Sequence, residues 1–93
     1  MVKHIVMWQL KEDINAEDAA SVIKVRLEGL VGIVPGLVSA EVGFDCNNRT
    51  LVLTSLLQTP QALAQYQTHP AHLEVVAYVK AAVCSRTCCD YMV

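Results

Sequence analysis

Tyr66-Gln67-Thr68-His69-Pro70-Ala71-His72 is the stretch that divides the helical part of the second half of this sequence into two pieces. Proline lacks a backbone N–H, clashes with the preceding helical turn, and favours an extended conformation at the residue before it. We therefore expect one helix to end near Thr68 or His69 and a second to begin with Pro70 at its first position. Tyr66 would lie on the last turn of the first helix and His72 on the first turn of the next, so both side chains can reach one small space.

On either side of this break, the chain alternates between strand and helix patterns. Residues 3–10 carry apolar side chains on both faces of an extended chain, which favours a strand in a sheet that is covered on both sides. Residues 16–34 repeat apolar side chains at helical spacing after Asn15, a good N-cap, and this helix must end before Pro35-Gly36. The remaining predicted elements are strands 37–44 (with Gly43 a candidate bulge) and 50–57, a turn at 45–49 between them, helices 60–68 (with Thr59 as N-cap) and 70–83, and a final strand 86–93.

The order β-α-β-β-α-β, with the second α in two pieces, places the chain in the α+β class. The crossover rule and the short hairpin favour a ferredoxin-like plait, in which helices cover one face of a four-stranded antiparallel sheet. The other sheet face would be bare, and residues such as Ile5 and Met7 would need a cover, for which the same face of a second copy is suited. Arg86 and Asp90 share one face of the last strand, where we expect structural ion pairs across the sheet.

Composition points to the same dimer. Hydrophobic residues make up 54% of the 93 residues and charged residues 17%, against about 25% charged in an average globular domain. A single domain of this size, which we expect to span residues 1–93, cannot hide so much apolar side chain by itself. The excess predicts a homodimer.

Charge and hydropathy argue against two classes of partner. The net charge is −2 and the seven Lys and Arg residues are scattered, so there is no basic footprint for nucleic acid. No apolar run approaches the roughly 18 residues of a membrane span, and we expect no signal peptide because a strand pattern begins almost at once. Cys46, Cys84, Cys88 and Cys89 show no paired framework, which favours reduced thiols in a cytoplasmic protein, with Cys84 and Cys88 in the core.

The sequence resembles the stress-responsive A/B barrel domain family, also called dimeric α/β-barrel proteins. The features that carry the resemblance cover essentially the whole chain in the right order, and the motif at the helix break is the most specific of them. They are Val2-Lys3-His4-Ile5-Val6, Pro35-Gly36, Tyr66-x-x-His69-Pro70-x-His72, and Arg86 with Asp90-Tyr91. The resemblance implies a homodimer in which two sheets form a barrel.

The resemblance also implies a site. One plant member is a cofactor-independent polyketide cyclase that closes a linear polyketide by an aldol step. By its pattern His72 would be the base, Tyr66 the donor to the developing oxyanion, and His4 an orienting group in the pocket. Neutral imidazole and phenol suit these roles near physiological pH. We add His69 and Trp8 as candidate substrate-binding residues, and expect a small hydrophobic or carbonyl ligand, no cofactor and no metal.

Three alternatives stay open. In the first, His69 caps a helix, His72 is a hydrogen-bonded, half-buried side chain and Tyr66 is a core residue. The dimer would then serve stress tolerance or ligand carriage without catalysis. In the second, His4, His69 and His72 ligate a metal, although a residue before proline is badly placed to converge with one on the next turn. The third is oxidative chemistry like that of quinol or haem monooxygenases with dimeric ferredoxin-like folds.

Overall fold

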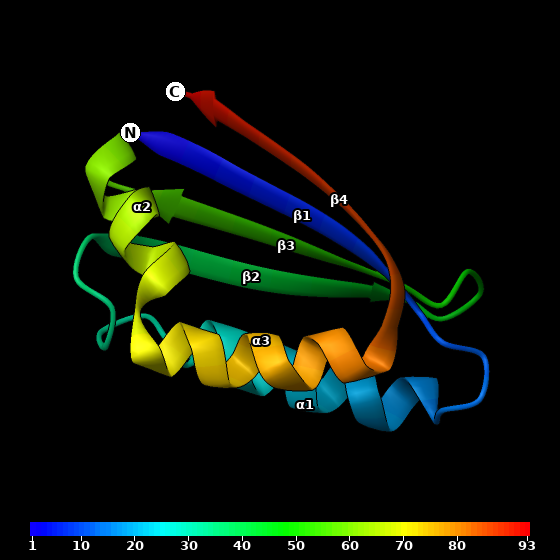
Figure 1. Cartoon of the computed structure of the whole chain (residues 1–93). Coiled ribbons are helices and arrows are strands. Elements are labelled where there is room, and N and C mark those ends of the chain that lie inside the picture. Colours follow the sequence, from blue (N-terminus) through cyan, green and yellow to red (C-terminus); the bar gives the residue numbers. More distant parts are fainter.

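The computed structural model describes residues 1–93. Its elements, in chain order, are β1 (Val2–Leu10), α1 (Ala16–Glu28), β2 (Leu37–Asp45), β3 (Thr50–Leu57), α2 (Pro60–Thr68), α3 (Pro70–Ala82) and β4 (Val83–Met92). The strands form one antiparallel sheet in the order β2-β3-β1-β4, and all the helices lie on one face of it (Figure 1). This arrangement confirms the predicted ferredoxin-like α+β fold. None of the helices has both the length and the apolar character needed to span a membrane.

Side-chain hydrogen bonds determine where the helices begin. Asn15 and Thr59 each accept a hydrogen bond at 3.0 Å from the backbone N–H three residues further on, as expected of N-caps. His69 has an extended backbone with ψ of 134°, and its Nδ1 accepts a hydrogen bond from Ala71 N at 3.1 Å. His69 therefore ends α2 and caps α3, which confirms the predicted break at Pro70.

The first helix ends earlier than its apolar spacing predicts. It stops at Glu28, with Gly29 as its C-cap, rather than running to Val34. After Glu28 the backbone N–H groups of Leu30 and Val31 bond to carbonyls three residues back instead of four, so the chain continues in tighter turns. Gly32 then has φ of +90°, a left-handed conformation that glycine adopts without steric cost. Val34 nevertheless packs in the core, whereas Val31, which the spacing places on the same apolar stripe, is exposed.

Two strand details also correct the sequence-based expectations. β4 begins at Val83, so this residue belongs to the strand and not to the preceding helix. The irregular pairing in β2 lies at its first residues, while Gly43 pairs regularly with Val52 and forms no bulge. A Cβ at Gly43 would lie 3.3 Å from a methyl carbon of Val52, so the glycine instead allows close cross-strand packing.

The core lies between the helices and one face of the sheet. β1 alternates regularly, and every second residue from Val2 to Leu10 is buried against the helices, including His4. β3 contributes Leu51, Leu53 and Leu57 to the same layer. The strand alternation thus places His4 among core residues, on the face that the helices cover.

The opposite face of the sheet has no helix over it (Figure 1). Ile5 is half-buried on that face, and Met7 and Tyr91 are 47% and 42% exposed. β4 is an edge strand, and every residue after its first is exposed. The prediction that Cys84 and Cys88 fill the core is therefore wrong, and all four cysteines are free.

Candidate functional site

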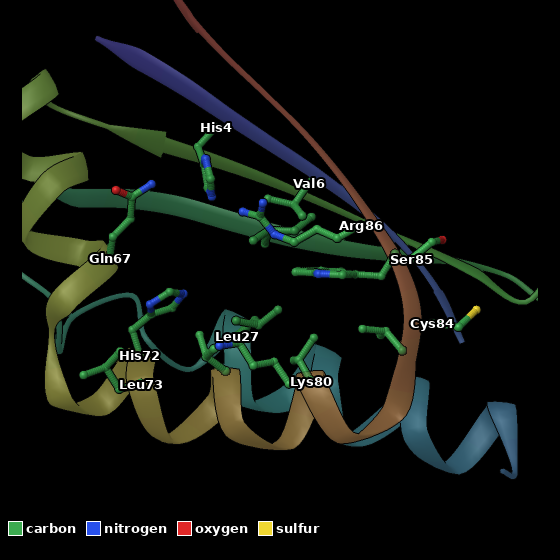
Figure 2. Close-up of a pocket in the computed structure, with 15 residues that line it drawn as sticks. His4, Val6, Leu27, Gln67, His72, Leu73, Lys80, Cys84, Ser85 and Arg86 are labelled. Atoms are coloured by element: carbon green, nitrogen blue, oxygen red, sulfur yellow. The ribbon is translucent and has the colours of Figure 1, made fainter. Parts of the chain in front are cut away.

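A cavity of about 670 Å³ lies between α3 and the sheet, with β4 along one side (Figure 2). Small-molecule sites in proteins commonly enclose about 300–1,000 Å³. Nine of the fifteen lining residues are hydrophobic, so the cavity favours a ligand with an apolar body. Val6 and Trp8 of β1 and Val76 and Val79 of α3 form much of this apolar wall.

Two of the histidines singled out in the sequence face this cavity. His4 lines it from β1 and His72 from the first turn of α3, and Figure 2 shows the two side chains pointing into the space from opposite sides. His4 is 3% exposed, and His72 is half-buried. Trp8, the other residue predicted on this strand face, also lines the cavity. The structure therefore brings together three of the five predicted site residues.

Asp90 holds the imidazole of His4. The two residues are paired in the register of β1 and β4, and His4 Nδ1 lies 2.5 Å from Asp90 Oδ1. A carboxylate accepts the hydrogen on Nδ1, so the other ring nitrogen of a neutral His4 remains available as an acceptor. The predicted cross-strand pairing of Asp90 is confirmed, and its partner is a cavity residue. Arg86, in contrast, forms no ion pair with a carboxylate.

Tyr66 lies behind His72 and not on the cavity wall. The two rings are tilted by 36° with centroids 4.1 Å apart, and Tyr66 also meets His4 edge-on at 6.0 Å. Tyr66 is 1% exposed and is absent from the cavity lining. Burial raises the pKa of Tyr66 to about 12, an effect that the Ser55 hydroxyl opposes. The predicted role of Tyr66 as direct donor to a bound oxyanion lacks a geometric basis, because its ring instead supports His72.

His72 has the electrostatic environment of a neutral imidazole. Burial is the main cause that lowers its pKa, the backbone of Gln67 partly offsets this effect, and positive charge from His4, Arg86 and His69 lowers the pKa further. The Nδ1 atom of His72 is buried and has no hydrogen-bond partner. A neutral imidazole in an apolar wall can accept a proton from a bound molecule.

His69 is not a cavity residue. Its ring nitrogen is used to cap α3, so it is not placed as the predicted substrate-binding residue. Because His69 does not line the cavity with His4 and His72, the three histidines do not converge on a metal. The donor atoms that do lie within reach of one another, all within 4.8 Å, belong to His4, Cys88 and Asp90. Burial and the Asp90 carboxylate raise the pKa of the Cys88 thiol, so this group is not a ready thiolate ligand.

Sequence reasoning missed two cationic residues of the cavity. Lys80 follows His72 and Val76 at successive i, i+4 positions of α3, and this spacing could have identified it. Arg86 is paired with Trp8 in the register of β1 and β4 and therefore lies on the same face of the sheet. The position of Arg86 in the cavity could not be predicted from the sequence, because the register of β1 and β4 was not known.

Comparison with known proteins agrees with this fold. The model of the Stress responsive A/B Barrel Domain family matches residues 2–93. No curated protein matches the chain.

Several solved structures share the fold. A dimeric protein of unknown function with a ferredoxin-like fold from Bacteroides fragilis has 26% identity and a TM-score of 0.90, with 99% of this chain and 95% of that one covered. A protein of Arabidopsis thaliana has 22% identity and a TM-score of 0.86, with 100% and 95% covered. A hydroxynitrile lyase from Passiflora edulis has 18% identity and a TM-score of 0.84, with 99% and 92% covered. Because the family model spans nearly all of the sequence, this chain belongs to the Stress responsive A/B Barrel Domain family.

Proposed function

We propose that this protein is a homodimer that binds a small apolar carbonyl compound and transfers protons on it without a cofactor. The observation that carries the proposal is the pair of imidazoles, His4 and His72, facing one apolar cavity from opposite walls. Asp90 holds the first imidazole and the Tyr66 ring supports the second. Both are therefore oriented before a ligand arrives, which is what acid–base catalysis requires of its groups.

The proposed reaction is an intramolecular aldol closure. His72 removes a proton from the carbon next to a carbonyl group, the electron pair moves toward the carbonyl oxygen, and an enolate and an imidazolium result. The enolate carbon attacks a second carbonyl carbon of the same molecule, a carbon–carbon bond forms, and the imidazolium returns its proton to the new alkoxide. His4 orients the substrate through its free ring nitrogen. The apolar walls exclude water and strengthen each electrostatic interaction in the cavity.

The open face of the sheet supports the homodimer. Its apolar side chains, among them Ile5, Met7 and Tyr91, are covered by no element of this chain. Burying such a face against an identical one gives a closed, two-fold symmetric assembly. The Bacteroides fragilis protein of the same fold is described as dimeric.

A dimer that carries an apolar ligand without chemistry is the second candidate. The position of Tyr66 favours it, because the expected donor to an oxyanion is buried behind His72. The Passiflora edulis protein of this fold is a hydroxynitrile lyase, which favours a catalytic role for the fold. The two candidates make different predictions about proton transfer from a bound carbonyl compound.

Deuterium exchange into methyl octyl ketone distinguishes them. In heavy water the wild-type protein should accelerate exchange at the carbons beside the carbonyl at least about tenfold over buffer, toward the range typical of positioned bases. His72→Gln should return the rate to that of buffer. His69→Asn is the matched control, because His69 lies outside the cavity and asparagine also caps helices. Ketone that binds without exchange would identify a carrier, and exchange that persists in His72→Gln would exclude His72 as the base.

A further inference from the structure

Two cationic side chains enter the cavity from different elements, and neither has a carboxylate partner. Lys80 comes from α3 and Arg86 from β4, and both line the cavity. Neither takes part in the two ion pairs of the protein, and no Asp or Glu lines the cavity. Figure 2 shows the guanidinium of Arg86 turned inward, beside Val6 and toward His4. The formal charges on the cavity wall are therefore positive only.

The environment of His72 reports the same excess of positive charge. After burial, which is the larger cause, repulsion by His4, Arg86 and His69 contributes to its lowered pKa. The Asp90 carboxylate lies 2.5 Å from His4 Nδ1, so it balances charge on His4, whereas Arg86 and Lys80 have no carboxylate within ion-pair distance. An anion placed beside Arg86 and Lys80 would be attracted by both.

We propose that the ligand of this cavity is an amphiphilic carboxylate, an inference that rests on the proposed ligand-binding function. The planar guanidinium of Arg86 can bind both oxygens of a carboxylate at once, and Lys80 can add a third charged donor. Both residues line the cavity, Lys80 from α3 and Arg86 from β4, and both are exposed to solvent. The carboxylate would stay partly hydrated there, while the apolar body of the ligand packs against Val6, Trp8 and Val79.

This charge arrangement defines which of two ligands of equal length the cavity prefers. A neutral molecule forms no charge-assisted hydrogen bond with Arg86 or Lys80, whose side chains are exposed and stay hydrated beside it. A carboxylate adds charge-assisted hydrogen bonds to both. The head group of the ligand, rather than the length of its apolar body, should therefore dominate selectivity.

Trp8 provides a direct readout. It is the only tryptophan of the chain and lines the cavity, so its fluorescence reports whether the cavity is occupied. We would titrate the full-length protein at neutral pH with octanoate and with octanol, which share an apolar chain and differ in charge. Octanoate should bind at least about tenfold more tightly, equivalent to about 1.4 kcal/mol. That preference should shrink as ionic strength rises, because the cationic side chains are exposed.

Substitutions assign the preference to the two cations. Arg86→Gln and Lys80→Gln should each weaken octanoate binding several-fold while leaving octanol binding unchanged, and Arg86→Lys should restore part of the loss. Arg26→Gln is the matched control, because that guanidinium lies over the Tyr78 ring at 5.2 Å and does not line the cavity. It should behave as wild type.

The outcomes separate this inference from the function on which it rests. Octanol binding as tightly as octanoate, or an undiminished preference in the Arg86→Gln, Lys80→Gln double variant, would overturn the carboxylate ligand and leave the ligand cavity intact. Failure of both probes to change Trp8 fluorescence or to bind by calorimetry would overturn the ligand cavity itself.

Discussion

Replacing Asp90 by asparagine tests whether the carboxylate holds the His4 imidazole, because the amide keeps an oxygen acceptor in the same place and removes only the charge. Hydrogen bonds to charged groups contribute about 1.5–3 kcal/mol to stability and neutral ones about 0.5–1.5 kcal/mol. The Asp90 side chain is 34% exposed, so solvent screening reduces the free energy that its charged hydrogen bond contributes. We expect Asp90→Asn to lower the free energy of unfolding by about 1 kcal/mol. Asp90→Ala should lower it by about 2 kcal/mol, because it leaves a buried ring nitrogen without an acceptor.

Urea denaturation at one fixed protein concentration measures these differences, since the stability of a dimer depends on its concentration. The free energy of unfolding should fall with urea concentration at the same slope in both variants, because the surface that unfolding exposes does not change. Glu74→Gln is the matched control, as Glu74 is exposed on α3 and forms no ion pair. If Asp90→Asn and Asp90→Ala both stayed within about 0.3 kcal/mol of the control, below the usual size of a charged hydrogen bond, the pairing would contribute nothing and the reasoning would be refuted.

Three further predictions concern other parts of the structure. Burial lowers the pKa of His72 below 6.5, so its contribution to stability is complete above that value and is lost as pH falls through the lowered pKa of the folded state. As pH falls, the urea midpoint of unfolding should therefore drop less in His72→Gln than in the wild-type protein. An equal drop in the two proteins would contradict the lowered pKa of His72. Met7→Glu on the open sheet face should convert dimer to monomer in sedimentation experiments, because an unpaired carboxylate would be buried at the interface; an unchanged mass would exclude that face. His69→Ala should cost about 1 kcal/mol in thermal unfolding and His69→Asn much less, since asparagine also caps helices; equal losses would argue against the capping role.

The parts of the fold that could be predicted from the sequence are those decided by near neighbours. Asn15 and Thr59 cap helices through a backbone N–H three residues away, and Pro70 breaks the chain through its own ring. The alternation of β1 likewise places His4 on one face whatever its partners are. The end of α1 was harder to predict because the apolar spacing continues past Glu28, while the backbone changes there to hydrogen bonds between residues three apart.

The site could be predicted only in part, because much of it depends on strand register. His4 and Asp90 are 86 positions apart in the sequence. The alternation of side chains along a strand shows only which residues of that strand share a face. Pairing β1 with β4 in a specific register is what brings Asp90 to His4 and Arg86 to the cavity. The motif at the helix break identified Tyr66 and His72 correctly as neighbours. It could not show that Tyr66 would point behind His72 rather than into the cavity.

The proposed function requires that a small molecule is held between His4 and His72. The most direct measurement is a titration of the isotope-labelled protein with methyl octyl ketone, followed by NMR at the side chains of the two histidines and Trp8. We expect these three resonances to shift together and saturate, while those of the turn at residues 45–49 do not respond. Shifts confined to the open sheet face around Met7, with the histidine resonances unchanged, would contradict the proposed function.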